Sequence, residues 1–250
     1  MEEVRSMTER KENTVRRVRG GGTMSSGMEG ADNYVRWIVD VFRPYFGENV
    51  LEIGTGFGNF RRHLPCRGRF VSVDIVPETI ESARSADREG VYVLADVSCG
   101  GFGEKLAGEL FDTVLCVNVL EHVEDEAKAL GNMFEVLAPG GRLLLLVPAF
   151  GALYSEMDSL AGHFRRYTKG EVGRLLERFP CGIVKLEYFN PVGGAGWWLN
   201  RFARHADLDG ALINRQIRFF DRVLVPVSRA VNPVTRGFFG QSVVCVAVRK

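Results

Sequence analysis

The residue types best suited to chemistry begin with a glycine-rich string that directly follows a short apolar run. The string, NVLEIGTGFGN, occupies residues 49–59. Glycines allow a tight turn and a close approach of the backbone to a ligand, and the N-terminus of a following helix presents free N–H groups. The sequence therefore predicts a strand, a ligand-binding glycine turn and a helix over 58–65.

Two common nucleotide-binding loops do not fit this string. A phosphate loop of the Walker type requires Gly-Lys-Ser/Thr after the glycines, and these residues are absent. A dinucleotide loop has the pattern GxGxxG, whereas here the third glycine comes one residue early, at Gly58, and Asn59 takes its place. Glu52 before the loop favours a nucleoside with a charged amino-acid tail, because an ammonium group can pair with that carboxylate.

Acidic residues follow at the ends of the next predicted strands. Asp74 lies 20 residues beyond Gly54, where a carboxylate can accept hydrogen bonds from both hydroxyls of a ribose. Asp96 and Val97 end a third strand, where an acid and an apolar side chain can meet the edge and the face of an adenine. Two further strings mark the ends of the fourth strand and the turn before the fifth: NVLEH at 118–122 and LAPGG at 137–141.

Taken in order, these motifs resemble those of the class I S-adenosylmethionine (SAM)-dependent methyltransferases, of the broad methyltransferase-11/12 type. The resemblance covers residues 34–189 and the last strand, and it rests on LEIGTGFG (51–58), VDI (73–75), ADV (95–97), NVLEH and LAPGG. It implies SAM as the cofactor, and it implies these contacts: the methionine part at Glu52, Gly54 and Gly56, the ribose at Asp74, the adenine at Asp96 and Val97, and the methyl side near Asn118. Thr55, Gly58 and Ile75 belong to the same motifs and are predicted cofactor contacts too.

Short apolar runs alternate with helical stretches along most of the chain, which predicts βαβ units and a parallel sheet. The expected strands are 49–53, 70–74, 91–95, 113–117, 142–147, 183–189 and 242–248. The expected helices are 34–46, 78–86, 104–109, 125–137 and 168–179. The resemblance implies an α/β, Rossmann-like, seven-stranded sheet of order 3-2-1-4-5-7-6 with strand 7 antiparallel, flanked by helices.

The segment after the fifth predicted strand, 148–167, is rich in side chains that can bind or activate an acceptor. It resembles the GHxRRY segment of a bacterial subgroup often associated with modification of sugars, lipid-linked compounds or secondary metabolites. His163 is a candidate base or acceptor-orienting group, and Arg165 or Arg166 is a candidate clamp for a carboxylate or phosphate. Tyr154 and Tyr167 are expected to shape the pocket. Alternatively, the two arginines lie exposed before a helix and pair with Asp158 or Glu156.

The remaining histidines and the cysteines are less informative. His122 is expected to border the cofactor and the active cleft, either in the chemistry or in shaping the SAM site. The four histidines are not at metal-ligand spacing with acids or thiols, so no metal site is predicted. The five cysteines form no CxxC pair, which favours reduced thiols and a cytoplasmic protein.

An insertion is predicted before the last strand, over 190–240. It begins with Asn190 and a glycine run expected to be flexible, followed by Trp197 and Trp198, and Asn190 and Trp197 are candidate acceptor contacts. An amphipathic helix is predicted over 212–225, with an interruption or kink at Pro226 and a break at Pro233. Three interpretations stay open for the insertion: a lid or substrate-pocket wall, a homodimer surface, or a helix that contacts a membrane surface.

Composition and charge bound the class of protein. The chain has 250 residues, 46% hydrophobic and 25% charged, with a net charge of +1. That profile excludes a highly basic nucleic-acid coat and a largely disordered chain, and no partnership with nucleic acid is predicted. The charge is uneven, because residues 190–250 hold nine basic and three acidic groups. Residues 1–30 are expected to be a disordered leader, and 31–250 a single domain that includes the insertion.

The predicted function is transfer of a methyl group from SAM to an oxygen or nitrogen of a small acceptor, with carbon as a less favoured target. The positive charge of the insertion suggests an anionic acceptor, and the subgroup resemblance adds a glycosylated one. Two alternatives stay open. One is a methyltransferase acting on a lipid-linked or polymeric glycan acceptor, and the other is a SAM-binding protein without catalysis.

Overall fold

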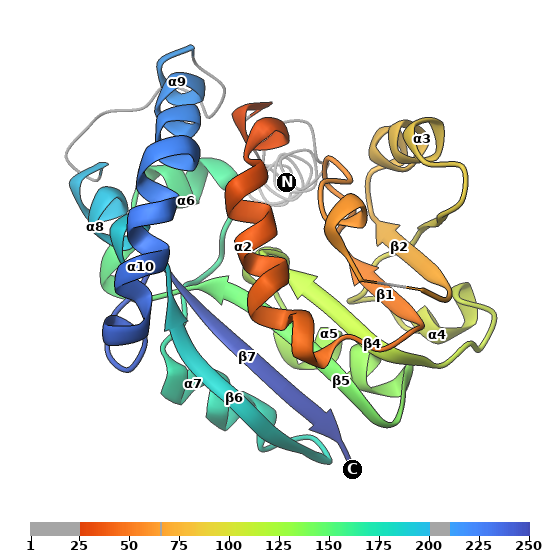
Figure 1. Ribbon diagram of the computed structural model, residues 1–250. Coiled ribbons are helices and arrows are strands. Elements are labelled where there is room, and N and C mark those ends of the chain that lie inside the picture. Colours follow the sequence, from red (N-terminus) through yellow and green to blue (C-terminus); the bar gives the residue numbers. More distant parts are fainter. Residues whose placement is uncertain (1–25, 66, 201–210) are drawn as a thin grey trace, which may run out of the picture.

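A computed structural model describes residues 26–65, 67–200 and 211–250, and in it one mixed sheet runs through the centre of the molecule (Figure 1). Its order is β3-β2-β1-β4-β5-β7-β6. β7 pairs antiparallel with β5 and β6, and the other neighbours are parallel. The predicted order and the antiparallel seventh strand are confirmed. The strands are β1 (Val50–Ile53), β2 (Phe70–Asp74), β3 (Val91–Leu94), β4 (Phe111–Val117), β5 (Leu137–Pro148), β6 (Cys181–Phe189) and β7 (Ser242–Arg249).

Helices cover both faces of the sheet, which explains why its central strands are apolar at nearly every position. The first helices along the chain are η1 (Ser26–Gly30), α2 (Asp32–Phe42), η2 (Arg43–Tyr45), η3 (Arg61–His63), α3 (Pro77–Ala86), α4 (Phe102–Lys105), η4 (Leu120–His122) and α5 (Glu126–Glu135). They are followed by η5 (Gly151–Leu153), α6 (Glu156–Ala161), α7 (Lys169–Leu176), α8 (Pro191–Asn200), α9 (Ala211–Phe219), the π-helical turn η6 (Phe220–Leu224) and α10 (Val225–Thr235).

The core lies in two layers, one on each side of the sheet. On one side, α4, α5 and α7 pack against alternate strand residues such as Leu143 and Leu145. On the other side, α2 covers the intervening residues, such as Leu144 and Leu146, and α3 covers β2 and β3. Burial of both sets stabilises the sheet, since each fully buried leucine contributes about 1.5–3 kcal/mol of transfer free energy. The sheet is therefore a rigid frame for the loops at its carboxyl ends.

Four local expectations were wrong. The segment 58–65 holds only the short 3-10 turn η3, and the glycine run of the insertion lies within helix α8. Pro233 does not break α10, which continues to Thr235. At Pro226 the helix type does change, because the π-helical turn η6 ends at Leu224 and Pro226 lies in the first turn of α10. Of the predicted leader, 26–30 forms η1, and 1–25 lies outside the described residues.

The described ranges contain no helix with the length and apolar character needed to cross a membrane.

Candidate active site

The glycine loop takes the conformation that its sequence predicts. Gly54 and Gly56 have φ angles of 84° and 51°, in the left-handed region that favours glycine. A Cβ on Gly54 would lie 2.4 Å from Cγ2 of Val119, so a larger residue has no room there. The loop closes around Asp74, whose carboxylate accepts hydrogen bonds from the N–H of Gly56 at 3.2 Å and of Val76 at 3.0 Å. Burial raises the pKa of Asp74 above its usual range.

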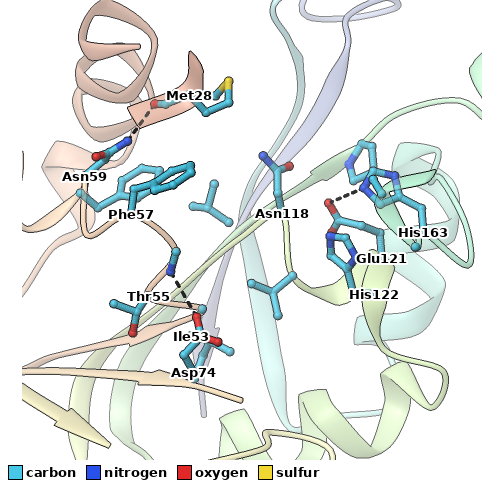
Figure 2. Close-up of a pocket in the computed structure, with 18 of the residues that line it drawn as sticks. Met28, Ile53, Thr55, Phe57, Asn59, Asp74, Asn118, Glu121, His122 and His163 are labelled. Carbon is cyan, nitrogen blue, oxygen red and sulfur yellow. Dashed lines mark hydrogen bonds and ion pairs between the residues drawn. The ribbon is translucent and has the colours of Figure 1, made fainter. Parts of the chain in front are cut away.

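A cavity of about 1540 Å³ opens at this loop and extends along the carboxyl ends of the strands. Most of the predicted cofactor contacts line it: Gly54, Thr55, Gly56, Asp74, Ile75, Asp96, Val97 and Asn118. We call this part of the cavity the glycine-loop side. Figure 2 shows Asn118 between Asp74 and a second group of polar residues, Glu121, His122 and His163, which we call the histidine side.

Two predicted cofactor contacts, Glu52 and Gly58, do not line the cavity. Gly58 has a φ of 70° and serves the turn. The Glu52 side chain is 2% exposed and lies beneath the loop, where it accepts a hydrogen bond of 2.6 Å from the hydroxyl of Ser72. Its Oε1 atom has no hydrogen-bond partner within the part of the chain that the structure describes. Burial raises the pKa of Glu52 to about 8, with Ser72 opposing the shift.

Replacing Glu52 by Gln is expected to flatten the pH dependence of stability. The folded protein keeps the Glu52 proton up to about pH 8, whereas an unfolded chain releases it above about 4.5. Between these values the unfolded state binds fewer protons, so the free energy of unfolding of the wild type falls as pH rises. Thermal unfolding of the ligand-free protein from pH 5 to pH 8 measures this slope. Glu177→Gln, at an exposed position, should keep the wild-type slope, and an equal slope in Glu52→Gln would contradict the prediction.

The histidine side holds a buried carboxylate without hydrogen bonds. The side chain of Glu121 is 1% exposed, and neither of its oxygens has a hydrogen-bond partner among the described residues. Nε2 of His163 lies 4.0 Å from Oε1 of Glu121. Burial raises the pKa of Glu121 to about 7, an effect opposed by the nearby His163 and Arg166. Burial also lowers the pKa of His122 to about 4, so this ring is neutral at physiological pH.

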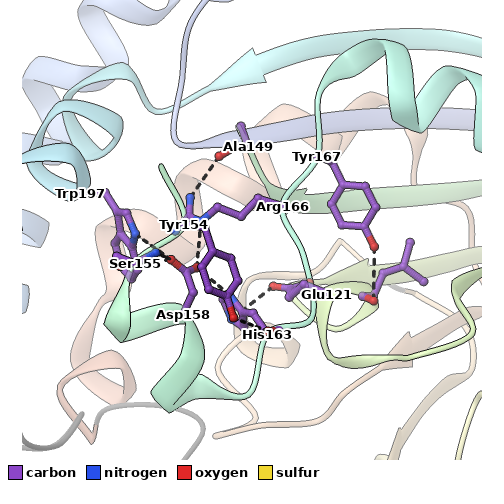
Figure 3. Close-up of polar contacts among 10 residues, drawn as sticks. Glu121, Ala149, Tyr154, Ser155, Asp158, His163, Arg166, Tyr167 and Trp197 are labelled. Carbon is purple, nitrogen blue, oxygen red and sulfur yellow. Dashed lines mark hydrogen bonds and ion pairs between the residues drawn. The ribbon is translucent and has the colours of Figure 1, made fainter. Parts of the chain in front are cut away.

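Asp158 joins the residues around His163. Its Oδ1 accepts from Nδ1 of His163 and from Nε of Arg166, both at 2.8 Å (Figure 3). Its Oδ2 accepts from the Ser155 N–H at 2.9 Å and from the Trp197 indole N–H at 3.2 Å. Although burial opposes it, the hydrogen bonds and charges of His163 and Arg166 hold the pKa of Asp158 below its usual range. Asp158 was named in the sequence only as one possible partner of an arginine, because its other partners meet it only in the fold.

Of the two adjacent arginines, only Arg166 faces the cavity, and Asp158 already pairs with its guanidinium. Arg165 points away and pairs with Glu126 at 2.9 Å. The predicted clamp for an anion is therefore not available on this loop: one arginine is bound to a buried carboxylate and the other is outside the cavity.

Three further predicted site residues have structural contacts and do not line the cavity. The Tyr154 hydroxyl donates to the His163 carbonyl at 2.7 Å, and the Tyr167 hydroxyl donates to the Glu126 carboxylate at 2.6 Å. Asn190 is fully buried and caps α8, because its Oδ1 accepts from the N–H of Gly193 at 3.0 Å. By contrast, Trp197 does line the cavity, from the next turns of the same helix.

Non-glycine residues in the left-handed region follow three of the strands that end at the cavity. They are Asn118 after β4, Phe150 after β5 and Asn190 after β6, with φ angles of 51°, 60° and 63°. Such conformations cost of order 1–3 kcal/mol each and are found mostly at functional sites. All three residues lie at the carboxyl edge of the sheet, which is the edge where ligands of open α/β sheets bind.

Glu121, His122 and His163 are also the residues that could hold a metal ion, which the spacing of the histidines did not indicate. One ligand atom from each lies within 4.8 Å of the others. A bound divalent ion needs ligand atoms at about 2.0–2.2 Å from the metal, so the three side chains would have to move closer together. In the structure as it stands, this arrangement favours a histidine with a free Nε2 over an assembled metal site.

The insertion forms a wall of the cavity, with α8 reaching Asp158 on the histidine side and α9 lying beside η1, which contacts Asn59 after the glycine loop. Its cavity-lining residues are Val192, Gly193, Gly196, Trp197, Leu199, Ile213, Gln216, Ile217, Phe219, Phe220 and Leu224. The described arginines of the insertion lie elsewhere: Arg215, Arg218, Arg222, Arg229 and Arg236 are exposed and outside the cavity lining. The positive charge of the described part of this segment, 190–200 and 211–240, therefore does not line the cavity.

The sheet order, the glycine loop and the acid after β2 together define the class I SAM-dependent methyltransferase fold. A comparison with protein families agrees with this fold assignment. Residues 51–145 match a family whose description is "Methyltransferase domain". This part of the chain is therefore a class I SAM-dependent methyltransferase domain, and SAM is the cofactor of that class.

Curated relatives match the same region. The chain is 31% identical over 111 residues to the ubiquinone biosynthesis O-methyltransferase of Aeromonas salmonicida (strain A449), an alignment covering 44% of this chain and 47% of that protein. It is 34% identical over 103 residues to nodulation protein S of Rhizobium tropici, covering 38% and 41%. The chain thus spans about half the length, or less, of the curated relatives it matches.

Solved structures share the fold across almost the whole chain. The N-methyltransferase NodS from Bradyrhizobium japonicum WM9, in complex with S-adenosylhomocysteine, covers 96% of this chain and 97% of its own with a TM-score of 0.52 at 16% identity. The [4+2]-cyclase SpnF aligns with a TM-score of 0.55 at 13% identity, covering 87% and 80%. Since a protein named as a cyclase shares the fold, the activity of this chain has to be argued from its own site.

Proposed function

We propose that this chain transfers a methyl group from SAM to an oxygen or nitrogen of a small, largely apolar acceptor, with His163 removing the proton. The observation that carries the proposal is the Asp158–His163 pair, whose histidine lines the same cavity as the glycine loop while Asp158 lies buried behind it. SAM, when bound, supplies an activated methyl group on a sulfonium sulfur. The protein has to orient the acceptor, exclude water and accept a proton.

The partners of His163 define which of its nitrogens acts as the base. Asp158 is a carboxylate with a lowered pKa, so its Oδ1 accepts a hydrogen bond from Nδ1 of His163. The proton on Nδ1 leaves Nε2 with a free lone pair on the side of Glu121 and the cavity. A hydroxyl or amine bound there can transfer its proton to Nε2 while Asp158 stabilises the imidazolium that forms.

The lining of the histidine side supports an apolar acceptor over the anionic one suggested by the charge of the insertion. Met157, Val192, Trp197, Leu224 and other apolar side chains surround it. Arg166 is the one arginine or lysine there among the described residues, and it is paired with Asp158. Glu121 would repel an anion when ionised, whereas it can accept a hydrogen bond from a hydroxyl or amine. A lipid-linked acceptor, the alternative substrate class, would also fit an apolar lining.

The insertion is proposed to act as the wall of the acceptor pocket within one domain that also holds the glycine loop. Its helix α8 supplies Trp197, and its later helices supply Ile213 and Phe220 to the cavity. The names of two similar proteins support methyl transfer to oxygen and nitrogen. The relative from Aeromonas salmonicida is called an O-methyltransferase, and NodS from Bradyrhizobium japonicum is called an N-methyltransferase.

The experiment is methyl transfer from labelled SAM to matched acceptor pairs, each a neutral phenol or amine and its carboxylated or phosphorylated analogue. We expect labelled product with the neutral members and little with the anionic ones. Transfer to the anionic members alone would contradict the proposed acceptor class. SAM binding without transfer to any acceptor, including a lipid extract, would favour the SAM-binding protein without catalysis.

A further inference from the structure

Helices α9, η6 and α10 follow one another without a break and form one long rod, residues 211–235, beside α2 and α8 (Figure 1). Hydrogen bonds of two polar side chains fix which face of this rod packs against the rest of the protein. Oδ1 of the buried Asp221 accepts from the N–H of Tyr34 at 2.8 Å, and the Ser228 hydroxyl donates to Oδ1 of Asn190 at 2.8 Å. The opposite face of the rod is therefore held toward solvent.

That outward face carries a row of large apolar side chains. They recur at intervals of three or four residues, so they share one face of the helices. Their exposed fractions are 56% for Phe219, 47% for Val223, 50% for Val227, 41% for Val231 and 76% for Val234. A contiguous apolar row of this size on a surface marks a place of interaction.

Arginines run beside the apolar row. Arg215, Arg218 and Arg222 are exposed, and none of them makes an ion pair with a carboxylate of the described ranges. Arg229 and Arg236, further along, pair with Asp40 and Glu187 and stay half-exposed. The end of the rod nearest α9 is thus both apolar and cationic.

The apolar row continues into the rim of the cavity. Phe219 belongs to the row and also lines the cavity. Leu199 of α8, which is 61% exposed, lines the cavity as well. A surface that received this face would therefore lie at the entrance to the histidine side.

We propose that the rod docks on an anionic lipid surface, with the apolar row in the acyl–headgroup boundary and the arginines on the headgroups. Apolar and arginine side chains side by side on one helix suit such a surface. The same face of a second copy offers no matching charge in a two-fold contact of rod against rod, because the only acid of the rod is the buried Asp221 and α8 has none. This proposal concerns binding to a lipid surface, and it does not depend on which molecule accepts the methyl group.

The test is co-sedimentation of the full chain with vesicles of phosphatidylcholine alone and of phosphatidylcholine with one third phosphatidylglycerol. We expect binding to the anionic vesicles, at least tenfold weaker binding to the neutral ones, and a decline with added salt. Light scattering on the same samples, without vesicles, should show no dimer that depends on the rod.

Two matched pairs of variants locate the surface. Val227→Glu should lose at least tenfold in anionic-vesicle binding, whereas Val184→Glu, at a valine of β6 that is 55% exposed, should bind as the wild type does. Arg218→Glu should weaken binding, whereas Arg178→Glu, an exposed arginine after α7, should not. All four positions lie outside the cavity lining, so SAM binding serves as the check on folding.

Equal binding by Val227→Glu and Val184→Glu would overturn the proposal, as would equal binding to neutral and anionic vesicles. A wild-type dimer that Val227→Glu dissociates, without vesicle binding, would assign the face to a second copy and also overturn it. Because vesicle binding requires no acceptor or turnover, a failure here is distinguishable from a failure of the proposed methyl transfer.

Discussion

Replacing Asp74 by Ala is expected to weaken the binding of S-adenosylhomocysteine by about 100-fold or more. Asp74 ends β2 and lines the cavity next to the glycine loop. A ribose there would donate two hydroxyl hydrogen bonds to this carboxylate, and each bond to a charged group contributes about 1.5–3 kcal/mol. A loss of about 3 kcal/mol corresponds to about a 100-fold change in the dissociation constant. Isothermal titration calorimetry with S-adenosylhomocysteine measures it directly.

The Asp74 carboxylate also stabilises the glycine loop. The loss of affinity in Asp74→Ala therefore combines a lost contact with the ribose and a structural change of the loop. Asp74 accepts from the N–H groups of Gly56 and Val76, and Ala removes both acceptors. Asp74→Asn keeps one oxygen and should fall between wild type and Ala in affinity. Thermal unfolding of both variants without ligand reports the structural part. Binding by Asp74→Ala within threefold of the wild type would contradict the assignment of Asp74 to the ribose.

His163→Ala is expected to lower kcat by roughly 100- to 10,000-fold, the usual contribution of a positioned base. The affinity for S-adenosylhomocysteine should stay within about twofold, because His163 lies on the histidine side of the cavity. Steady-state kinetics with the acceptor found in the transfer assay give kcat, and calorimetry gives the affinity.

The acidity of the acceptor separates a base from a residue that only shapes the pocket. A phenol that is already ionised needs no proton acceptor, so the loss of rate in His163→Ala should shrink as the phenol becomes more acidic. A loss that is the same for all phenols contradicts the role as a base. A rate that EDTA abolishes and a divalent metal restores also contradicts it, since His163 would then be a ligand together with Glu121 and His122.

The position of the glycine loop and of Asp74 at the cavity could be predicted because these parts are local in sequence, whereas their contacts with a cofactor stay predictions. The loop at Gly54–Gly56 and the acid at Asp74 lie at the ends of neighbouring strands, and the βαβ spacing brings them together. Helix 58–65 could not be predicted correctly, because three glycines in the left-handed region continue the turn as far as Gly58.

The acceptor side depends on contacts between distant segments, which no local pattern reports. Trp197 reaches Asp158 from 39 residues away. The sequence predicts a flexible glycine run at the start of α8, but Gly193 is packed so tightly that a Cβ would lie 2.2 Å from Nδ2 of Asn190. Glycine is required there for close packing, and the Asn190 cap starts the helix. The arginines of the insertion were expected to face the acceptor because charge was counted by segment, whereas helix rotation decides where each side chain points.

The hydrogen bonds of Asp158 have a consequence for the strength of the proposed base. One carboxylate holds both the imidazole of His163 and the indole of Trp197, which belongs to α8 and lines the cavity. An acceptor that displaces Trp197 would alter the environment of the base in the same event. For the proposed reaction, an acceptor that moves the Trp197 indole would remove one hydrogen bond from Asp158, and this carboxylate would then bind the protonated imidazole of His163 more strongly.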